Sequence, residues 1–171
     1  MIPVLLSPNR LGPPGAILYD GHSIVEGLLL NSGERWTDQC NNSLTASGLQ
    51  FSTFNSSIGG QTTTEMLADV TTSLDPHIVA GGQLSRHTHI STIAGIQSLI
   101  NDIRLGGDVA THLENQKTWL LGRRALGCTT FVVLECRCDA LTVGGNYESA
   151  RLAAKSAWNT TYRSYVDIII D

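Results

Sequence analysis

The sequence predicts an α/β domain: a three-layer sandwich in which a five-stranded parallel sheet carries helices on both faces. Two observations favour this class. Short apolar runs of strand length alternate along the chain with longer segments whose apolar residues recur at helical spacing. The chain of 171 residues, 42% hydrophobic and 15% charged, also suits one domain with a sizeable core. Because crossovers between parallel strands are right-handed, a doubly wound sheet of strand order 2-1-3-4-5 is expected.

An N-terminal arm is predicted ahead of this domain. Four of the five prolines fall within residues 1–14. Proline fixes φ and removes a backbone donor, so residues 1–15 are expected to form an extended arm outside the sheet. The arm carries Val4, Leu5, Leu6 and Leu11, and we expect it to lie on its own domain or on a partner, in a homo-oligomer or a larger assembly. Residues 16–171 are expected to form the α/β domain.

The predicted strands are short apolar runs. Residues 16–20 end in a glycine turn, and their near-continuous apolar side chains require burial on both faces of a sheet. Residues 49–55 alternate apolar and polar side chains, and residues 130–135 are the clearest β-branched and aromatic run. In chain order, the predicted strands are 16–20, 49–55, 92–100, 130–135 and 166–170.

Helices are predicted in the intervals between these strands. Three of them start at a polar residue followed three positions later by glutamate, as in a capping box. These pairs are Asn31 with Glu34, Thr62 with Glu65, and Thr111 with Glu114. Gly127 is predicted to end the third helix, and an alanine-rich helix is predicted over residues 147–165. A stretch of Ser, Thr, His and Gly over residues 76–91 predicts a long loop.

Three loops follow predicted strands at the edge where parallel sheets bind ligands. Residues 20–27, Asp-Gly-His-Ser-Ile-Val-Glu-Gly, place Ser23 on a tight turn from strand to helix, which is how an α/β fold presents a nucleophile. In residues 55–63, the adjacent Gly59 and Gly60 have amides that can face an anion. Asn101 follows the third strand, and its side chain can donate to an oxyanion.

Together these three blocks resemble those of the SGNH (GDSL-type) hydrolases. Gly21-His-Ser-Ile-Val resembles the family's Gly-Asp-Ser-Ile-Thr, residues 55–63 resemble its second block, and Leu99-Ile-Asn-Asp resembles its Gly-x-Asn-Asp. The segment from Arg123 through the strand at Phe131 is similar to phage- and bacteria-associated members. The resemblance covers residues 16–171 and implies a flavodoxin-like sandwich. The activity it implies is serine esterase chemistry on a small-molecule or carbohydrate ester, often an acetyl ester, and no cofactor or metal is expected.

The resemblance assigns three site residues. It implies that Ser23 is the nucleophile, and that the amides of Ser23 and Gly60 with the Asn101 side chain form the oxyanion hole. His22 and Leu99 depart from the family, which has aspartate and glycine there. The family's Asp-x-x-His block follows the last strand, so we expect that the last helix and its histidine-bearing loop are missing here. Because a serine hydroxyl is a poor nucleophile without a base, weak or no activity is expected.

None of the five histidines is expected to replace that base. His22 adjoins the nucleophile, but adjacent side chains usually diverge. His87-Thr-His89 has the spacing of a metal pair on one face of a strand. Without a third ligand nearby, ordinary loop histidines are the preferred interpretation. His77 and His112 are predicted at a loop and a helix start.

Two other functions remain open. The first is a non-catalytic descendant: a carbohydrate-binding or structural component of a larger assembly, such as a phage or virion particle. The proline-rich arm and the missing histidine favour it, and Ser23 would then serve only as a helix cap. A flavodoxin-like binding module is less favoured, because no phosphate-binding glycine-rich loop follows the first strand.

Charge, hydropathy and cysteine content narrow the remaining classes. A net charge of −4 without a Lys/Arg cluster disfavours nucleic acid as a partner. No run approaches the roughly 18 apolar residues of a membrane span, and the N-terminus lacks the basic start of a secretory signal. A soluble protein is therefore expected, virion-associated under the structural alternative. Cys136 and Cys138 alternate on the predicted strand and are poorly placed to bridge each other.

Overall fold

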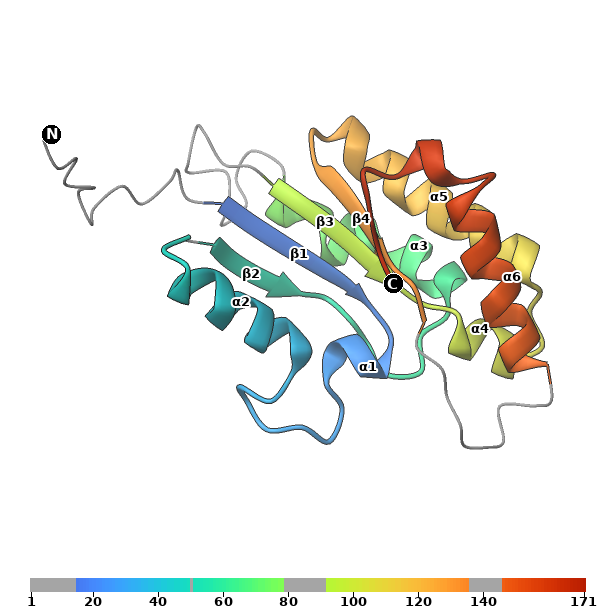
Figure 1. Cartoon of the computed structure of the whole chain (residues 1–171), viewed down its shortest axis with the longest axis horizontal. Coiled ribbons are helices and arrows are strands. Elements are labelled where there is room, and N and C mark those ends of the chain that lie inside the picture. The colour runs from blue at the N-terminus through green and yellow to red at the C-terminus, as the bar shows by residue number, and fades with distance from the viewer. Residues whose placement is uncertain (1–14, 50, 79–91, 136–145) are drawn as a thin grey trace, which may run out of the picture.

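The computed structural model describes residues 15–49, 51–78, 92–135 and 146–171. The five strands in these ranges form one parallel sheet in the order β2-β1-β3-β4-β5, with helices on both faces (Figure 1). Their bounds are Gly15–Gly21 (β1), Phe51–Asn55 (β2), Thr92–Gln97 (β3), Thr129–Val133 (β4) and Ile168–Ile170 (β5). The predicted α/β class and strand order are confirmed.

The helices pack in two groups (Figure 1). One face of the sheet carries the first two helices, and the other face carries the remaining longer ones. The six α-helices of the described ranges are Ser23–Glu26 (α1), Trp36–Ala46 (α2), Thr63–Ser73 (α3), Ile100–Arg104 (α4), Val109–Ala125 (α5) and Tyr147–Asn159 (α6). Two short 3₁₀ helices cover Asp75–His77 and Arg163–Tyr165.

Strand β1 is buried on both faces, as its apolar run predicts. Leu18 is fully buried in the larger core, beneath α3, α5 and α6. Ile17 and Tyr19 point the other way, into a smaller core with Val25 of α1 and Phe131 of β4. Because successive side chains alternate across a strand, one short segment supplies both cores. The turn after β1 therefore follows a strand that is packed on both faces.

A close approach in the smaller core depends on a glycine. Gly95 of β3 lies in register between Tyr19 and Phe131. The rings of Tyr19 and Phe131 pack edge to face, with centroids 6.0 Å apart. A Cβ on Gly95 would lie 2.1 Å from two carbons of the Phe131 ring. The ring thus occupies the space that any other side chain would need.

Several predicted helix starts are wrong by a few residues. Asn31 and Glu34 form a closed turn, with the Glu34 carboxylate accepting from the Asn31 amide at 2.8 Å, and α2 starts only at Trp36. Helix α5 starts at Val109, because Asp108 accepts from the Thr111 amide at 2.9 Å and is the N-cap in place of Thr111. The capping box of Thr62 that precedes α3 is confirmed, with both reciprocal bonds present.

Other boundaries are shorter than predicted. The apolar run predicted as strand 92–100 ends as a strand at Gln97, and α4 starts at Ile100. The helix predicted over 147–165 ends at Asn159, because Thr160 leaves the helical conformation with φ of −119° and ψ of −80°. Strand β4 is 129–133 rather than 130–135, and β5 is 168–170 rather than 166–170. Gly127 ends α5 as predicted, with φ of 89°.

Some predictions fall wholly or partly on residues that the structure does not describe. Gly15 starts β1, one residue before the predicted domain boundary, and residues 1–14 of the predicted arm lie outside the described ranges. The same holds for residues 79–91 of the predicted loop, including His87 and His89, and for Cys136 and Cys138.

Candidate active site

The turn after β1 presents Ser23 as the first residue of α1. Gly21 makes this turn possible, because a Cβ there would lie 2.5 Å from Val25 Cγ2 and 2.6 Å from the Gln97 carbonyl oxygen. The α1 helix is therefore pressed against the end of the sheet. Ser23 itself is partly exposed, at the carboxyl edge of an interior strand. This is the placement that the sequence predicts for a nucleophile.

The second loop is bonded to the same turn. The Ser56 amide donates to the Tyr19 carbonyl at 2.9 Å, and the Ile58 amide donates to the Gly21 carbonyl at 3.1 Å. These bonds bring Gly59 onto Ser23: a Cβ on Gly59 would lie 3.6 Å from Ser23 Cβ. Gly60 follows with φ of 86°, and no heavy atom lies within 4 Å of where its Cβ would be. The second loop thus covers one side of Ser23 and leaves Gly60 open.

The third loop reaches the second through Asn101. This side chain is 6% exposed, and its Nδ2 donates to the carbonyl of Gln61 at 3.0 Å. Gln61 is the residue after Gly60, so the amide of Asn101 lies against the glycine loop. Asn101 has a second Nδ2 hydrogen, and the amides of Ser23 and Gly60 have no backbone or side-chain acceptor in the described part of the chain. The structure therefore brings Ser23, Gly60 and Asn101 to one edge of the sheet.

Comparisons with known proteins show which solved structures share this fold. No family model and no curated protein matches the sequence. Solved structures do match, among them AlinE4, described as an SGNH-hydrolase family esterase, at 18% identity over 92% of this chain and 76% of that chain, with a TM-score of 0.70. The chain has the SGNH-hydrolase fold.

Two further structures extend the likeness of the SGNH fold. A lipolytic protein of the G-D-S-L family from Veillonella parvula is 17% identical over 91% of this chain and 76% of its own, with a TM-score of 0.64. The acetylxylan esterase Axe2 from Geobacillus stearothermophilus is 13% identical over 92% of this chain and 75% of its own, with a TM-score of 0.65. At these identities the likeness concerns the fold.

His22, where the SGNH family has aspartate, is fully buried and bonded on both ring nitrogens. Its Nδ1 accepts from the Ile24 amide at 3.2 Å and caps α1. Its Nε2 lies 2.5 Å from Oε1 of Glu135, just beyond β4. An Nδ1 that accepts an N–H has no proton, so the proton is on Nε2 and is donated to Glu135. His22 therefore positions the turn that bears Ser23 and has no free nitrogen.

A second buried pair, Asp102 and His112, connects the helices that follow the site loops. The Asp102 carboxylate accepts from Thr63 Oγ1 at 2.6 Å and lies 3.3 Å from His112 Nδ1. Burial raises the pKa of Asp102, but the hydrogen bonds from His112 and Thr63 outweigh it and hold the pKa below its ordinary value. The pair links α3, α4 and α5 beneath the candidate site. The sequence placed His112 at a helix start, and the structure shows it buried within α5.

The described histidines leave Ser23 without a base. The Ser23 hydroxyl has no hydrogen-bond partner in the described ranges, where three histidines occur. His22 and His112 are paired with carboxylates, and the ring of His77 stacks on Phe54 with centroids 3.5 Å apart. None of these three histidines is therefore available as a base for Ser23.

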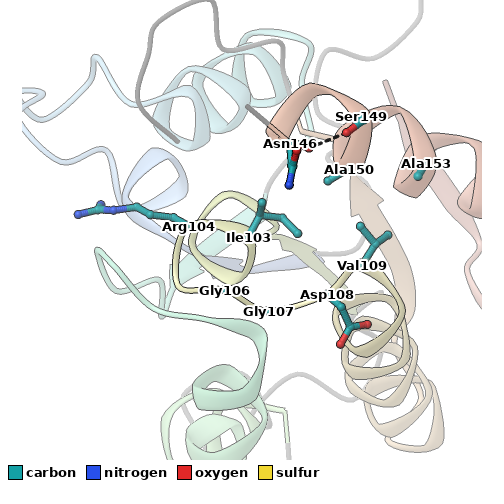
Figure 2. A pocket seen from close by; sticks show the side chains of 10 residues that line it. All are labelled: Ile103, Arg104, Gly106, Gly107, Asp108, Val109, Asn146, Ser149, Ala150 and Ala153. Carbon is teal, nitrogen blue, oxygen red and sulfur yellow. Dashed lines mark hydrogen bonds between the residues drawn. The ribbon is translucent and has the colours of Figure 1, made fainter. Parts of the chain in front are cut away.

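Two hollows lie near this edge of the SGNH fold. One of about 880 Å³ lies between α6 and the loop joining α4 to α5, and Figure 2 shows Asn146 and Ser149 at its α6 side. Ser23, Gly60 and Asn101 do not line it. A second, open hollow of about 440 Å³ is lined by residues 58–61 with Glu65 and Asp69 of α3. Ser23 and Asn101 do not line the second hollow either, but of the two hollows it is the one that contains the glycine loop.

The described residues contain neither a metal-binding group of side chains nor a helix that could span a membrane. Within them, no group of three His, Cys, Asp or Glu side chains is arranged to hold a metal ion. No helix in these ranges is both long enough and apolar enough to cross a membrane.

Asp20, the last polar residue of β1 before the turn, is 2% exposed. It accepts from the Gly21 amide at 2.9 Å and from Trp119 Nε1 at 2.8 Å. Burial raises the pKa of Asp20 to about 6, even though both hydrogen bonds favour the ionised form and lower it. The turn bearing Ser23 is thus anchored to α5 by a carboxyl group whose charge is costly.

This shift predicts a pH dependence of stability. At pH values between 3.8, the ordinary pKa of aspartate, and about 6, Asp20 is protonated mainly in the folded state. The contribution of Asp20 to stability is therefore fully present below pH 3.8 and is lost as the pH rises through about 6. The wild type should lose about 3 kcal/mol of unfolding free energy relative to Asp20→Asn over this window. Urea denaturation at several pH values measures the difference, and parallel profiles for the two proteins would contradict the prediction.

Proposed function

We propose that this domain is a serine esterase in which Ser23 is the nucleophile. The observation that carries the proposal is the meeting of three loops: Gly59 against Ser23, and Asn101 on the carbonyl next to Gly60. Each loop follows a different strand of the sheet, and the three residues are those that the resemblance assigns. If Ser23 served only as a helix cap, neither the Gly59–Gly60 loop nor the Asn101 loop would need to lie beside it.

The proposed chemistry is acyl transfer from an ester to water. Ser23 Oγ attacks the ester carbonyl carbon as a general base takes its proton, and the carbonyl oxygen becomes an oxyanion. The amides of Ser23 and Gly60 and the second Nδ2 hydrogen of Asn101 donate to it. The C–O bond to the alcohol then breaks, the alcohol leaves with the proton that the base held, and the acyl–serine ester remains. Water then releases the acid. Loss of one such donor, as in Asn101→Ala, costs about 10²–10³ in kcat.

Two observations support the proposed substrate class, a small-molecule or carbohydrate ester. The hollow beside Gly60 is open to solvent and has room for such a ligand. Solved structures of this fold include esterases, one of them described as an acetylxylan esterase. None of the three described histidines activates Ser23 in this proposal, since each is engaged elsewhere.

A second candidate function is ester or carbohydrate binding without turnover, within a larger assembly. The observation that favours it is the same engagement of His22, His77 and His112 away from Ser23. A site with oxyanion donors but no base would bind a carbonyl group without cleaving it.

Hydrolysis of p-nitrophenyl acetate by the 171-residue chain tests the proposal. We expect a turnover below about 1 s⁻¹, the low end of ordinary enzymes, because no described base contacts Ser23. The residual rate should fall in Ser23→Ala, and a serine-reactive phosphonate fluoride should label Ser23, as located by mass spectrometry.

The possible outcomes separate the two functions. Equal rates for wild type and Ser23→Ala, with no preferential labelling of Ser23, contradict the esterase and favour the binding function. A rate above about 1 s⁻¹ that vanishes in Ser23→Ala establishes the esterase and means that this chain contains its own base. Replacing His22, His87 and His89 in turn would then identify that base.

A further inference from the structure

The side chain of Glu26 is an acid without a partner in the described part of the chain. Glu26 is only partly exposed, and its Oε2 is buried and accepts no hydrogen bond. Buried polar atoms are nearly always hydrogen-bonded, because an unpaired carboxylate oxygen inside a protein is costly. The packing of this turn therefore gives no reason for a charged group at position 26.

Glu26 lies on the same helical face as Ser23. The two are the last and the first residues of α1, and side chains three residues apart on a helix have Cβ atoms about 5–6 Å apart. The Cβ position of Gly59 lies 3.6 Å from Ser23 Cβ and 2.8 Å from Glu26 Oε2. This carboxylate oxygen is therefore no farther from Ser23 Cβ than those two distances together.

Gly59 leaves room for the carboxylate beside the serine. Any larger residue there would place its Cβ 2.8 Å from Glu26 Oε2, closer than such atoms normally approach. The Ser23 hydroxyl has no partner in the described ranges either. Rotation about side-chain bonds can bring Oγ and Oε2 together, and catalytic hydrogen bonds often tighten only when substrate binds. A free donor and a free acceptor thus lie beside the same glycine.

The other buried carboxylates around this turn have different tasks. Asp20 accepts from the Gly21 amide on one oxygen and from Trp119 on the other. Glu135 accepts from Nε2 of His22, and the opposite side of that ring, Nδ1, caps α1. The imidazole therefore stands between Glu135 and the helix that starts at Ser23. Of these three carboxylates, only that of Glu26 is on the same helix as the serine.

We propose that Glu26 is the general base that activates Ser23. This inference rests on the proposed esterase function. Glu26 Oε2 takes the proton of Ser23 Oγ as Oγ bonds to the ester carbonyl carbon, and it returns that proton to the alcohol oxygen as the C–O bond breaks. In the second half, Glu26 takes a proton from water as the water oxygen bonds to the acyl carbon. Ser23 Oγ recovers that proton when the acyl–serine bond breaks.

The rate at which a phosphonate fluoride labels Ser23 tests this role in a single chemical event. The Oγ–P bond forms, the P–F bond breaks, fluoride leaves, and the base takes the Oγ proton. Glu26→Gln keeps the shape of the side chain without its basicity, so labelling should slow by about 10²-fold or more. Hydrolysis of p-nitrophenyl acetate should fall in the same proportion.

Glu34→Gln is the matched control for the change of charge. Glu34 lies in the loop after α1, is exposed, and accepts from the Asn31 amide, a bond that glutamine can also accept. This variant should be labelled at the wild-type rate. Urea denaturation verifies that Glu26→Gln is folded, and its midpoint should be no lower than that of wild type, because the variant removes an unpaired buried charge.

Chemical rescue separates a base from a group that only holds the turn in place. Glu26→Ala leaves a space beside Gly59, and formate can supply the missing carboxylate there. Added formate should raise the labelling rate of Glu26→Ala by about tenfold or more and should leave that of wild type unchanged. No rise with formate would mean that Glu26 has a structural role, and would overturn the proposal.

The outcomes also separate this inference from the esterase function. If Ser23 is labelled as fast in Glu26→Gln as in wild type, and hydrolysis still falls in Ser23→Ala, another group is the base and only the present inference fails. If wild type and Ser23→Ala hydrolyse p-nitrophenyl acetate equally slowly and Ser23 is not labelled preferentially, the esterase function fails, and the role of Glu26 fails with it.

Discussion

Glu135→Ala is expected to lower the free energy of unfolding by about 2 kcal/mol. Glu135 is 6% exposed and His22 is fully buried, so alanine would leave the Nε2–H of His22 without an acceptor in the interior. The loss should also reach the site, because His22 caps the helix that starts at Ser23. Urea denaturation measures the stability, and labelling of Ser23 by a phosphonate fluoride should slow at a pH where both proteins are folded.

Glu135→Gln is the matched variant for this prediction. A glutamine oxygen can still accept from Nε2–H, and a neutral His22 needs no negative partner, so the loss should be about 1 kcal/mol or less. Equal losses for Gln and Ala would show that His22 is charged and that the interaction is an ion pair. A loss below about 0.5 kcal/mol for Ala would contradict the assigned role of the pair.

Gly95→Ala is expected to lower the free energy of unfolding by about 3 kcal/mol or more. The added methyl would lie 2.1 Å from the Phe131 ring, which is itself packed against Tyr19. Gly95 is on β3, between β1 and β4, so neither neighbouring strand can move aside without breaking the sheet. A lower denaturation midpoint with an unchanged m-value would report the strain.

The control for Gly95→Ala is Gly122→Ala, with the opposite sign. Gly122 is within α5 and has no heavy atom within 4 Å of its Cβ position, so alanine should stabilise by about 0.5–1 kcal/mol. Adding Phe131→Leu to Gly95→Ala should recover part of the lost stability by removing the ring. A Gly95→Ala protein as stable as wild type would contradict the packing described for this core.

Local patterns were sufficient for the class and order of the sheet, because they depend on short-range periodicity and on the handedness of crossovers. The apolar run of residues 16–20 alone required an interior strand. Helix boundaries were less predictable, since neighbouring polar residues compete as caps. Asp108 caps α5 although Thr111 shows the more familiar capping-box spacing. At residues 92–100 an apolar run continued from strand into helix, which periodicity alone does not separate.

The candidate site was predictable only where its residues lie in recognisable blocks. Ser23, Gly60 and Asn101 were named from such blocks, and the structure places them at one edge. Glu135 was missed as the partner of His22, 113 residues away, because no local pattern links two positions so far apart. Its position at the end of a predicted strand was the available signal. The contact of Asp102 with His112 likewise depends on how α4 packs on α5.

Two of the three proposed oxyanion donors belong to the peptide backbone, at Ser23 and Gly60. A change of side chain does not delete a backbone N–H, except a change to proline. Point mutations that abolish turnover, at the serine or at its base, would therefore leave most of the carbonyl-binding cradle in place. In this architecture, few mutations would convert an esterase into a protein that only binds the ester. The reverse change would need only a nucleophile and a base, because the backbone donors would still be present.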